Sequence, residues 1–176
     1  MMINQKTLAA MKHFKRTELI RCYYESKEQR CKGCRLTSAV KHAPNCVDVN
    51  IEALVENVLD PAREQLGRPI YVTSGFRCPF YNDVVGGVKN SQHILGEAAD
   101  IYIGSPEENL KLARIIAEQG AFDQMILYVN SASSLAPRFI HVTYKRPSKG
   151  SGANPNRHRI LKQVAGAPGY SLVPSL

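Results

Sequence analysis

Two histidines and an aspartate stand in this chain at spacings that favour a turn joined to a sheet. His93 lies in a polar segment, and Asp100 follows seven residues later at the start of an apolar run. A single helix aligns residues three or four apart, so this spacing favours a turn that folds back onto a strand. His141 lies in an alternating stretch in which residues 139, 141 and 143 share one face of a strand.

The three side chains form a ligand set that suits zinc. Two imidazoles and one carboxylate leave a fourth tetrahedral position open for water, which is typical of a catalytic rather than a structural site. A lone histidine is more often a hydrogen-bonded structural residue, but the joint pattern of His93, Asp100 and His141 favours the metal. His13 and His158 have no such context, and we interpret both as surface residues.

The predicted elements give an α+β fold, with helices packed on a small, mainly antiparallel sheet that carries the metal on its face. Amphipathic spacing predicts a helix that begins at Asn50, with Pro61 either as a kink or as the first position of a second helical segment capped by Asp60. Ser105 starts a capping-box pattern for a helix that ends at Gly120. The other predictions are a short helix at 15–24, a strand at 69–73, and an antiparallel pair at 122–129 and 138–144.

The motif Ser-x-His-x-x-Gly-x-Ala-x-Asp at 91–100, followed by the strand with His141, resembles the zinc D-Ala-D-Ala carboxypeptidases and L-alanyl-D-glutamate endopeptidases. These are cell-wall peptidases with a Hedgehog N-domain-like fold. The segment 72–77, Val-Thr-Ser-Gly-Phe-Arg, resembles the family's Ser-Gly-Tyr-Arg sequence. Gly-Gly-Val at 86–88 and Phe-Asp-Gln at 122–124 are also similar to small phage and bacterial members. The resemblance covers about residues 47–145, the length of one domain.

The resemblance implies hydrolysis of peptide bonds in peptidoglycan stem peptides. Zinc held by His93, Asp100 and His141 would lower the pKa of its water and polarise the scissile carbonyl. Arg77 would hold a substrate carbonyl or terminal carboxylate, because its forked donors suit two oxygens. Ser91 would add a hydrogen bond to the substrate or to the loop of the site.

The general base expected from the resemblance is missing. The family has a Glu or Asp three residues before the last histidine or at the end of the preceding strand, and here these positions are Arg138 and Tyr128. Alternation puts Gln124 and Tyr128 on the face of the site and Asp123 on the other. Tyrosine is a poor base near neutral pH, although it can donate to a developing oxyanion.

This departure leaves three alternatives open. The chain is an active peptidase that recruits another carboxylate, with Asp123 and Glu97 as candidates, or a catalytically weak zinc-binding module that recognises cell-wall peptides. The third alternative is a zinc-stabilised adaptor or nucleic-acid-binding protein, built on the cysteines and the basic C-terminal region.

Four residues in the N-terminal region have a spacing that can hold a second, structural zinc. They follow the pattern Cys-x2-Cys-x7-His-x3-Cys, formed by Cys31, Cys34, His42 and Cys46. Each half of the pattern supplies two ligands of a tetrahedral site. Disulfides and unconnected thiols remain open as alternatives.

The length of 176 residues and the 44% hydrophobic content suit one domain with appendages. We expect an N-terminal helix and Cys-rich insertion at 1–46, a zinc peptidase-like core at 47–145, and a basic, Gly/Pro/Ser-rich tail at 146–176. No Asp or Glu follows Asp123, and most of the net charge of +8 comes from the basic residues after it: Arg138, Lys145, Arg146, Lys149, Arg157, Arg159 and Lys162. Such a region can contact a polyanion.

The sequence contains no apolar run long enough for a membrane span, and its N-terminus lacks the apolar region of a secretory signal. We therefore expect a cytoplasmic, monomeric protein that reaches the cell wall on lysis.

Overall fold

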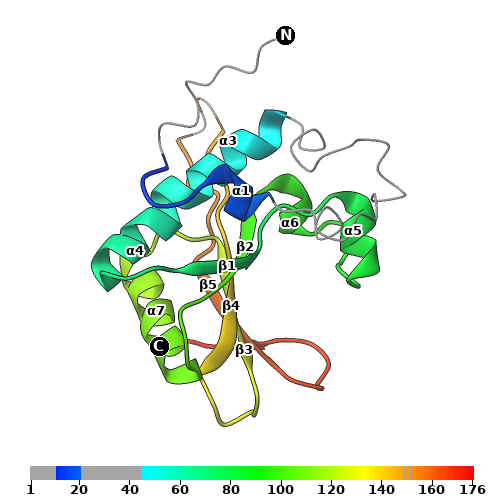
Figure 1. Ribbon diagram of the computed structural model, residues 1–176. Coiled ribbons are helices and arrows are strands. Elements are labelled where there is room, and N and C mark those ends of the chain that lie inside the picture. The colour runs from blue at the N-terminus through cyan, green and yellow to red at the C-terminus, as the bar shows by residue number, and fades with distance from the viewer. Residues whose placement is uncertain (1–10, 21–44, 149, 151) are drawn as a thin grey trace.

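A mainly antiparallel sheet forms the centre of the computed structural model, which describes residues 11–20, 45–148, 150 and 152–176. In these residues six strands are ordered β1-β2-β4-β3-β5-β6, and only the β3–β5 pair is parallel. The sheet and its helices confirm the predicted α+β class (Figure 1). The strands are β1 (Tyr71–Ser74), β2 (Ala98–Tyr102), β3 (Gln124–Val129), β4 (Pro137–Thr143), β5 (Arg159–Val164) and β6 (Ser171–Leu172).

Helices lie on both sides of this sheet in Figure 1, with α4 and α7 to its left and α5 and α6 to its right. The α-helices are α1 (Arg16–Leu19), α3 (Asn45–Leu54), α4 (Asp60–Leu66), α5 (Pro79–Val84), α6 (Gln92–Leu95) and α7 (Pro106–Gln119), and η3 (Val55–Leu59) is a π-helical turn. None of the helices in the described ranges is both long and apolar enough to cross a membrane.

The helix predicted from Asn50 begins five residues earlier, at Asn45, and continues through η3 into α4. Pro61 stands in the first turn of α4, directly after the π-helical turn. A proline ring collides with the carbonyl four residues before it in a regular helix, and the wider turn relieves this crowding. The prediction that Asp60 caps α4 is wrong. Its buried carboxylate accepts the backbone N–H groups of Lys12 at 2.8 Å and His13 at 3.1 Å, and so fixes the N-terminal segment.

Helix α7 follows its sequence signals. Ser105 Oγ accepts the N–H of Glu108 at 3.3 Å, and the Glu108 carboxylate accepts the N–H of Ser105 at 2.9 Å, which completes the capping box. The helix ends at Gly120, whose φ of 67° lies in the left-handed region that favours glycine. The predicted helix is confirmed at both ends.

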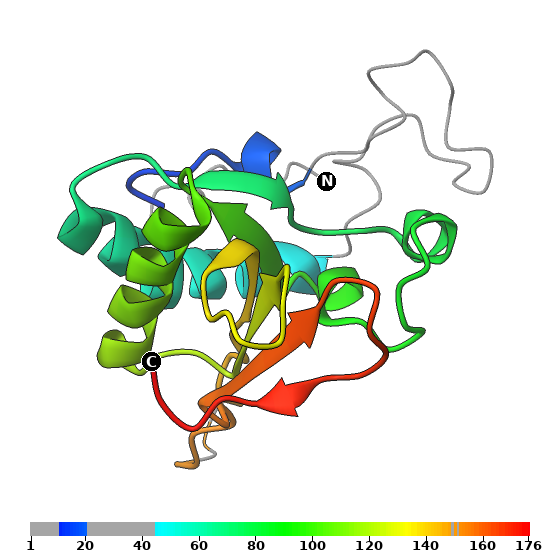
Figure 2. The same cartoon turned by 90° about the horizontal axis from the view of Figure 1, so that it is seen from below.

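Strands β5 and β6 lie in the segment that the sequence suggests is a tail. β5 pairs in parallel with β3, and a turn then leads into β6, which pairs back onto β5 (Figure 2, orange to red). In Arg-Ile-Leu-Lys-Gln-Val at 159–164 the apolar residues do not alternate with polar ones, so the pattern of a half-buried strand is absent. The sheet therefore extends beyond residue 145.

Alternation along the central strands separates the core from the opposite face of the sheet. Residues 99 and 101 of β2, 125, 127 and 129 of β3, and 140 and 142 of β4 are buried in the hydrophobic core. Helices α3, α4 and α7 contribute the apolar side chains that pack with them. The residues between these positions, which include Asp100, Tyr128 and His141, therefore point to the other face of the sheet.

Candidate metal centre

Strand pairing brings Asp100 and His141 together. They are direct neighbours across the antiparallel β2–β4 pair, and Ile126 of β3 stands on the other side of His141. Directly opposite residues in antiparallel strands have Cβ atoms about 4.5–5.5 Å apart and share a face. The register of the sheet therefore sets two of the three predicted ligands side by side.

A short helical turn delivers His93 to the same place. Ser91 caps α6, and its Oγ accepts the N–H of His93 at 3.4 Å. Gly96 ends the turn with a φ of 74°, and a Cβ atom there would lie 2.8 Å from the carbonyl oxygen of Val47. Only glycine suits both the left-handed backbone and the close packing, so the chain can reverse directly into β2. The Ser-x-His-x-x-Gly motif thus has a local structural reason.

Three ligand atoms converge in the cleft. His141 Nδ1 lies 2.8 Å from Asp100 Oδ1 and 3.2 Å from His93 Nε2, and His93 Nε2 lies 3.3 Å from Asp100 Oδ1. His93, Asp100 and His141 form a group that could hold a metal ion. His93 Nδ1 lies 2.6 Å from the carbonyl oxygen of Gly75 and donates its proton there, which leaves Nε2 free to bind a metal.

The protonation states also fit a cation. Burial would raise the pKa of Asp100, but hydrogen bonds with His141 and His93 lower it below its ordinary value, so the carboxylate is ionised. Burial lowers the pKa of His93 and favours the neutral imidazole. Metal ligands must be deprotonated, so the ionised Asp100 and the neutral His93 are both suited to bind a cation.

Arg77 holds the second oxygen of the aspartate. Its Nη2 donates to Asp100 Oδ2, and its Nε donates to Ser74 Oγ at 2.7 Å. The guanidinium and the carboxylate are both largely buried. Asp100 therefore faces the histidines with Oδ1 and Arg77 with Oδ2, and this orientation leaves little freedom for the carboxylate to rotate.

The ligand group opens into a cleft of about 500 Å³. The loop between residues 85 and 92 forms one wall, and β3, β4 and Tyr170 form the rest. Of the predicted site residues, Arg77, Ser91 and Tyr128 line the cleft, together with the three candidate ligands. Gln124 also lines it, so the predicted alternation of β3 is confirmed.

A family model described as peptidase M15 matches residues 12–143. The chain belongs to the peptidase M15 family. A search of the curated proteins finds no match. The match confirms the resemblance to the D-Ala-D-Ala carboxypeptidase-like zinc peptidases, and M15 peptidases depend on zinc. The matched range includes the whole candidate metal centre, so the family supports a metallopeptidase.

Asp123, one candidate base of this M15 peptidase, is engaged elsewhere. Its carboxylate is fully buried, and it accepts Arg157 Nε and Nη2 at 2.7 Å each and the backbone N–H of Arg157 at 3.1 Å. Lys145 Nζ lies 3.7 Å away. Although burial would raise the pKa of Asp123, the hydrogen bonds and charge of Arg157 lower it. This ion pair ties the start of β3 to the chain that enters β5.

Glu97, the other candidate base, lies behind Gln92. The Gln92 Nε2 group donates to Glu97 Oε2 at 3.3 Å and to Asp123 Oδ2 at 3.2 Å. Burial raises the pKa of Glu97. Gln92 lines the cleft, whereas neither carboxylate does. Both donor hydrogens of the amide are thus directed away from the cleft, and its oxygen is the atom left for a substrate.

Tyr170 of the M15 peptidase was not predicted from the sequence. It follows Gly169 in the turn before β6, and its side chain reaches the cleft near Tyr128. Turn residues such as Pro168 and Gly169 predict a loop but give no hint of what that loop contacts. Only the pairing of β5 with β3 brings this turn to the metal centre.

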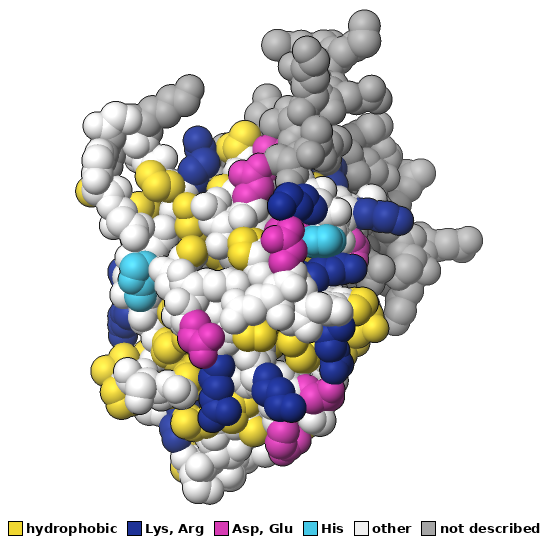
Figure 3. All heavy atoms as spheres, turned by 90° about the vertical axis from the view of Figure 1, so that its left-hand side faces the viewer, with side chains coloured by type: hydrophobic (Ala, Val, Ile, Leu, Met, Phe, Trp, Pro, Cys, Tyr) yellow, Lys and Arg dark blue, Asp and Glu magenta, His cyan; other side chains and the backbone are white. Residues whose placement is uncertain are grey.

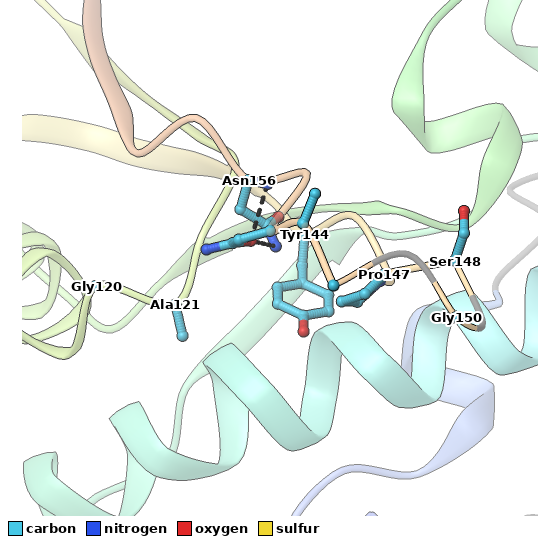
Figure 4. A pocket seen from close by; sticks show the side chains of 10 residues that line it. Gly120, Ala121, Tyr144, Pro147, Ser148, Gly150 and Asn156 are labelled. Atoms are coloured by element: carbon cyan, nitrogen blue, oxygen red, sulfur yellow. Dashed lines mark hydrogen bonds between the residues drawn. The ribbon is translucent and has the colours of Figure 1, made fainter.

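A second cavity of about 650 Å³ lies away from the metal centre, beside Gly120 and Tyr144 (Figure 4). The Asn156 side chain holds its loop, accepting the N–H of Lys145 at 2.8 Å and donating to the Lys145 carbonyl at 3.1 Å. None of the described residues that line it is His, Cys, Asp or Glu. It therefore offers no comparable ligand set.

The predicted Cys-rich zinc site falls on residues that the structure does not describe. Cys31, Cys34 and His42 lie outside the described residues, and so does the side chain of Cys46. The spacing of these four residues remains a prediction from the sequence.

Proposed function

We propose that this M15 peptidase hydrolyses peptide bonds in peptidoglycan stem peptides, with zinc held by His93, Asp100 and His141. The observation that carries the proposal is the convergence of two imidazole nitrogens and one carboxylate oxygen in an open cleft. The family match supports the reaction class. The proposed route to the substrate is release on lysis, and the proposed working form is a monomer.

The protein supplies orientation and hydrogen bonds for this reaction. Zinc, when bound, supplies an activated water and polarises the substrate carbonyl. Gly75 fixes the tautomer of His93, and Arg77 holds Asp100 in place. Tyr128 donates to the oxygen that gains negative charge, where a fixed donor is most effective. Ser91 and the Gln92 amide oxygen are placed to bind the peptide backbone in the cleft.

The charges in the cleft favour an internal peptide bond over a bond next to a free terminal carboxylate. Arg77 is the only Lys or Arg among the described residues that line the cleft, and it is paired with Asp100 and Ser74. A terminal carboxylate would lose its hydration there without gaining an unpaired cation, which is costly. We therefore favour endopeptidase over carboxypeptidase activity.

A second function, recognition of wall peptides without efficient cleavage, is supported by one observation. In the described part of the cleft, Asp100 is the only carboxylate, and both of its oxygens are engaged. Asp123 is bound by Arg157, and Glu97 lies behind Gln92. A reaction without a carboxylate base loses roughly 10²–10⁴-fold in rate. Slow hydrolysis and pure recognition are thus the two outcomes to separate.

The separating experiment is a digest of purified peptidoglycan with zinc-loaded protein, with products identified by mass spectrometry. Internal cleavage fragments support the endopeptidase, and free D-Ala supports the carboxypeptidase. Binding to the wall without any product supports the recognition module. His141→Ala is the matched negative control, since any product that remains with it comes from a contaminant.

Contact with a polyanion is a further part of the proposal, although charge is mixed on one side of the molecule. In the view of Figure 3, Lys and Arg side chains are interspersed with Asp and Glu. Arg157 is neutralised by Asp123. The adaptor alternative would require salt-sensitive binding of DNA or RNA without affinity for the wall.

A further inference from the structure

The lining of the metal cleft changes in character along β3. Ile126 stands beside His141 in the β3–β4 pair, at the level of the candidate ligands. Gln124 and Tyr128 lie two residues to either side on the same face, each a step of roughly 7 Å along the strand. All three line the cleft, and so does Phe139 opposite Tyr128. One end of the cleft is thus aromatic, and the other end begins with an amide side chain.

Gln92 belongs to the second of these ends. Its Nε2 donates to Asp123 Oδ2 at 3.2 Å, and Asp123 directly precedes Gln124 at the start of β3. The same nitrogen donates to Glu97 Oε2 at 3.3 Å. We define the amide end of the cleft by its two glutamine side chains, Gln92 from α6 and Gln124 from β3.

The side-chain amide of Gln92 is held in one orientation. Both oxygens of Asp123 accept the Arg157 guanidinium at 2.7 Å, so this carboxylate is ionised and can only accept hydrogen bonds. A reversed amide would set the Gln92 oxygen against Asp123 Oδ2, where two acceptors repel each other. Because the two hydrogens of Nε2 are already used, Gln92 offers the cleft an acceptor and no donor.

Gln124 differs from Gln92 in this respect. In the part of the chain that the structure describes, only the backbone of Gln124 is hydrogen-bonded: its N–H donates to Thr143 Oγ1 at 3.0 Å, and its carbonyl accepts the Thr143 hydroxyl at 3.3 Å. Its side-chain amide can therefore turn to present either a donor or an acceptor. Gln124 adapts to its partner, so any choice between substrate groups at the amide end falls to Gln92.

We propose that Gln92 is a specificity-determining residue that accepts an N–H of a substrate carboxamide and disfavours a carboxylate in the same place. A carboxylate there would bring a second acceptor against the Gln92 oxygen. It would also gain no unpaired cation, because Arg77 is the only Lys or Arg among the described residues of the cleft and is paired with Asp100. The inference rests on the proposed peptidase function and names its substrate class as amidated stem peptides.

The test compares two synthetic stem peptides that differ only in the α-carboxyl group of their D-glutamyl residue, which is free in one and a carboxamide in the other. We expect zinc-loaded wild-type protein to cleave the amidated peptide with a kcat/KM about tenfold higher, the effect of one hydrogen bond. Gln92→Met has a side chain of similar length without the amide. It should bring the ratio of the two kcat/KM values close to one, mainly by slower cleavage of the amidated peptide.

Gln92→Lys guards against a variant that fails for structural reasons. Its ammonium group can still donate to Glu97 and Asp123, as the amide nitrogen does, but it has no acceptor for the substrate. The preference for the amidated peptide should be lost or reversed. Gln65→Met and Gln65→Lys are the matched controls and should keep the wild-type ratio, since Gln65 is exposed on α4 and does not line the cleft. Zinc content and Tm of all variants show whether the fold is intact.

Two results of the cleavage assay would overturn the role of Gln92 while leaving the proposed function intact. One is equal or faster cleavage of the free-carboxylate peptide by wild-type protein. The other is a wild-type ratio in either Gln92 variant that folds and binds zinc.

Calorimetric binding of the same two peptides decides the matter if wild-type protein cleaves neither. Tighter binding of the amidated peptide, lost in Gln92→Lys, supports the inference although the peptidase function fails. Equal binding of the two peptides contradicts the inference, and absence of any binding contradicts both proposals.

Discussion

A Cβ atom on Gly75 would lie 2.1 Å from the backbone carbonyl oxygen of Leu19. The end of α1 therefore packs directly on the segment that supports the metal centre. The same Leu19 carbonyl accepts the N–H of Phe76 at 2.7 Å, while the Gly75 carbonyl accepts His93 Nδ1–H. A backbone contact between residues that are not ligands thus supports the carbonyl group that orients His93.

Gly75→Ala should lower both stability and zinc affinity. The added methyl group meets rigid backbone, and such overpacking costs about 1–3 kcal/mol. Displacement of the carbonyl that orients His93 should weaken zinc binding about 10- to 100-fold. Thermal melts and zinc titration measure the two effects. Gly152→Ala is the control, because nothing lies within 4 Å of a Cβ there; equal behaviour of the two variants would contradict the role of the contact.

Removal of any one ligand should abolish zinc binding and hydrolysis. We expect wild-type protein to bind one zinc in the centre, and His141→Ala to lose it, because two remaining ligands hold the ion weakly. The measurement is zinc per chain after dialysis, with Cys31, Cys34 and Cys46 changed to Ser to exclude metal at the cysteines. His13→Ala is the control histidine, since its ring pairs with Glu64 instead. Full zinc occupancy in His141→Ala would show that the ligand set is wrong.

Arg77→Lys should keep the fold and the zinc but lose activity. Lysine cannot donate to both Asp100 and Ser74 with the geometry of a guanidinium. We expect a loss of about 2 kcal/mol in transition-state binding, measured as kcat/KM. Arg138→Lys is the matched control, since Arg138 is exposed on β4 and does not line the cleft. Turnover equal to wild type in Arg77→Lys would contradict the role of the two guanidinium hydrogen bonds.

Asp123 should stabilise the protein in a pH-dependent way. Its folded pKa is lowered, so its contribution is present above the unfolded pKa of about 3.9 and is lost as pH falls through the folded value. Asp123→Asn should cost about 1–3 kcal/mol at neutral pH and little in acid below the folded pKa. Urea unfolding at a series of pH values measures this. Asp83→Asn, at an exposed position on α5, is the matched control for the substitution itself.

Local sequence signals predicted the parts of the site that lie within one element or one turn. The Ser91 to Gly96 turn, the capping box at Ser105 and the alternation of β3 all depend on neighbours a few residues away, so their patterns are visible in the chain. The resemblance to the zinc peptidases implied that His141 joins His93 and Asp100, although they are distant in the sequence.

The features that could not be predicted depend on partners far along the chain. Asp60 binds backbone groups 47 and 48 residues away instead of capping its own helix. Arg157 neutralises Asp123 from a segment whose composition indicates a solvated tail. Tyr170 enters the cleft only because β5 adds to the sheet in parallel, and a strand without alternation gives no signal of that pairing.

Tyr128 stands where the resemblance implies a carboxylate base, and the structure places its side chain in the cleft. Burial, and to a smaller extent the nearby Tyr170, raises the pKa of Tyr128. The phenol therefore stays protonated and cannot serve as a base at neutral pH. We therefore expect slow hydrolysis by the native chain. A general base typically raises the rate about 10²–10⁴-fold, and loss of the tyrosine donor lowers it about tenfold.

Tyr128→Glu should consequently raise kcat by at least about tenfold, provided that zinc content is unchanged. Tyr71→Glu is the control, because the same change at an exposed tyrosine outside the cleft adds charge without a base. The pH–rate profile of Tyr128→Glu should gain an acidic limb, since a glutamate must be ionised to accept a proton. If the native chain is already fast and Tyr128→Glu inactivates it, the base comes from another residue and Tyr128 acts only as a donor.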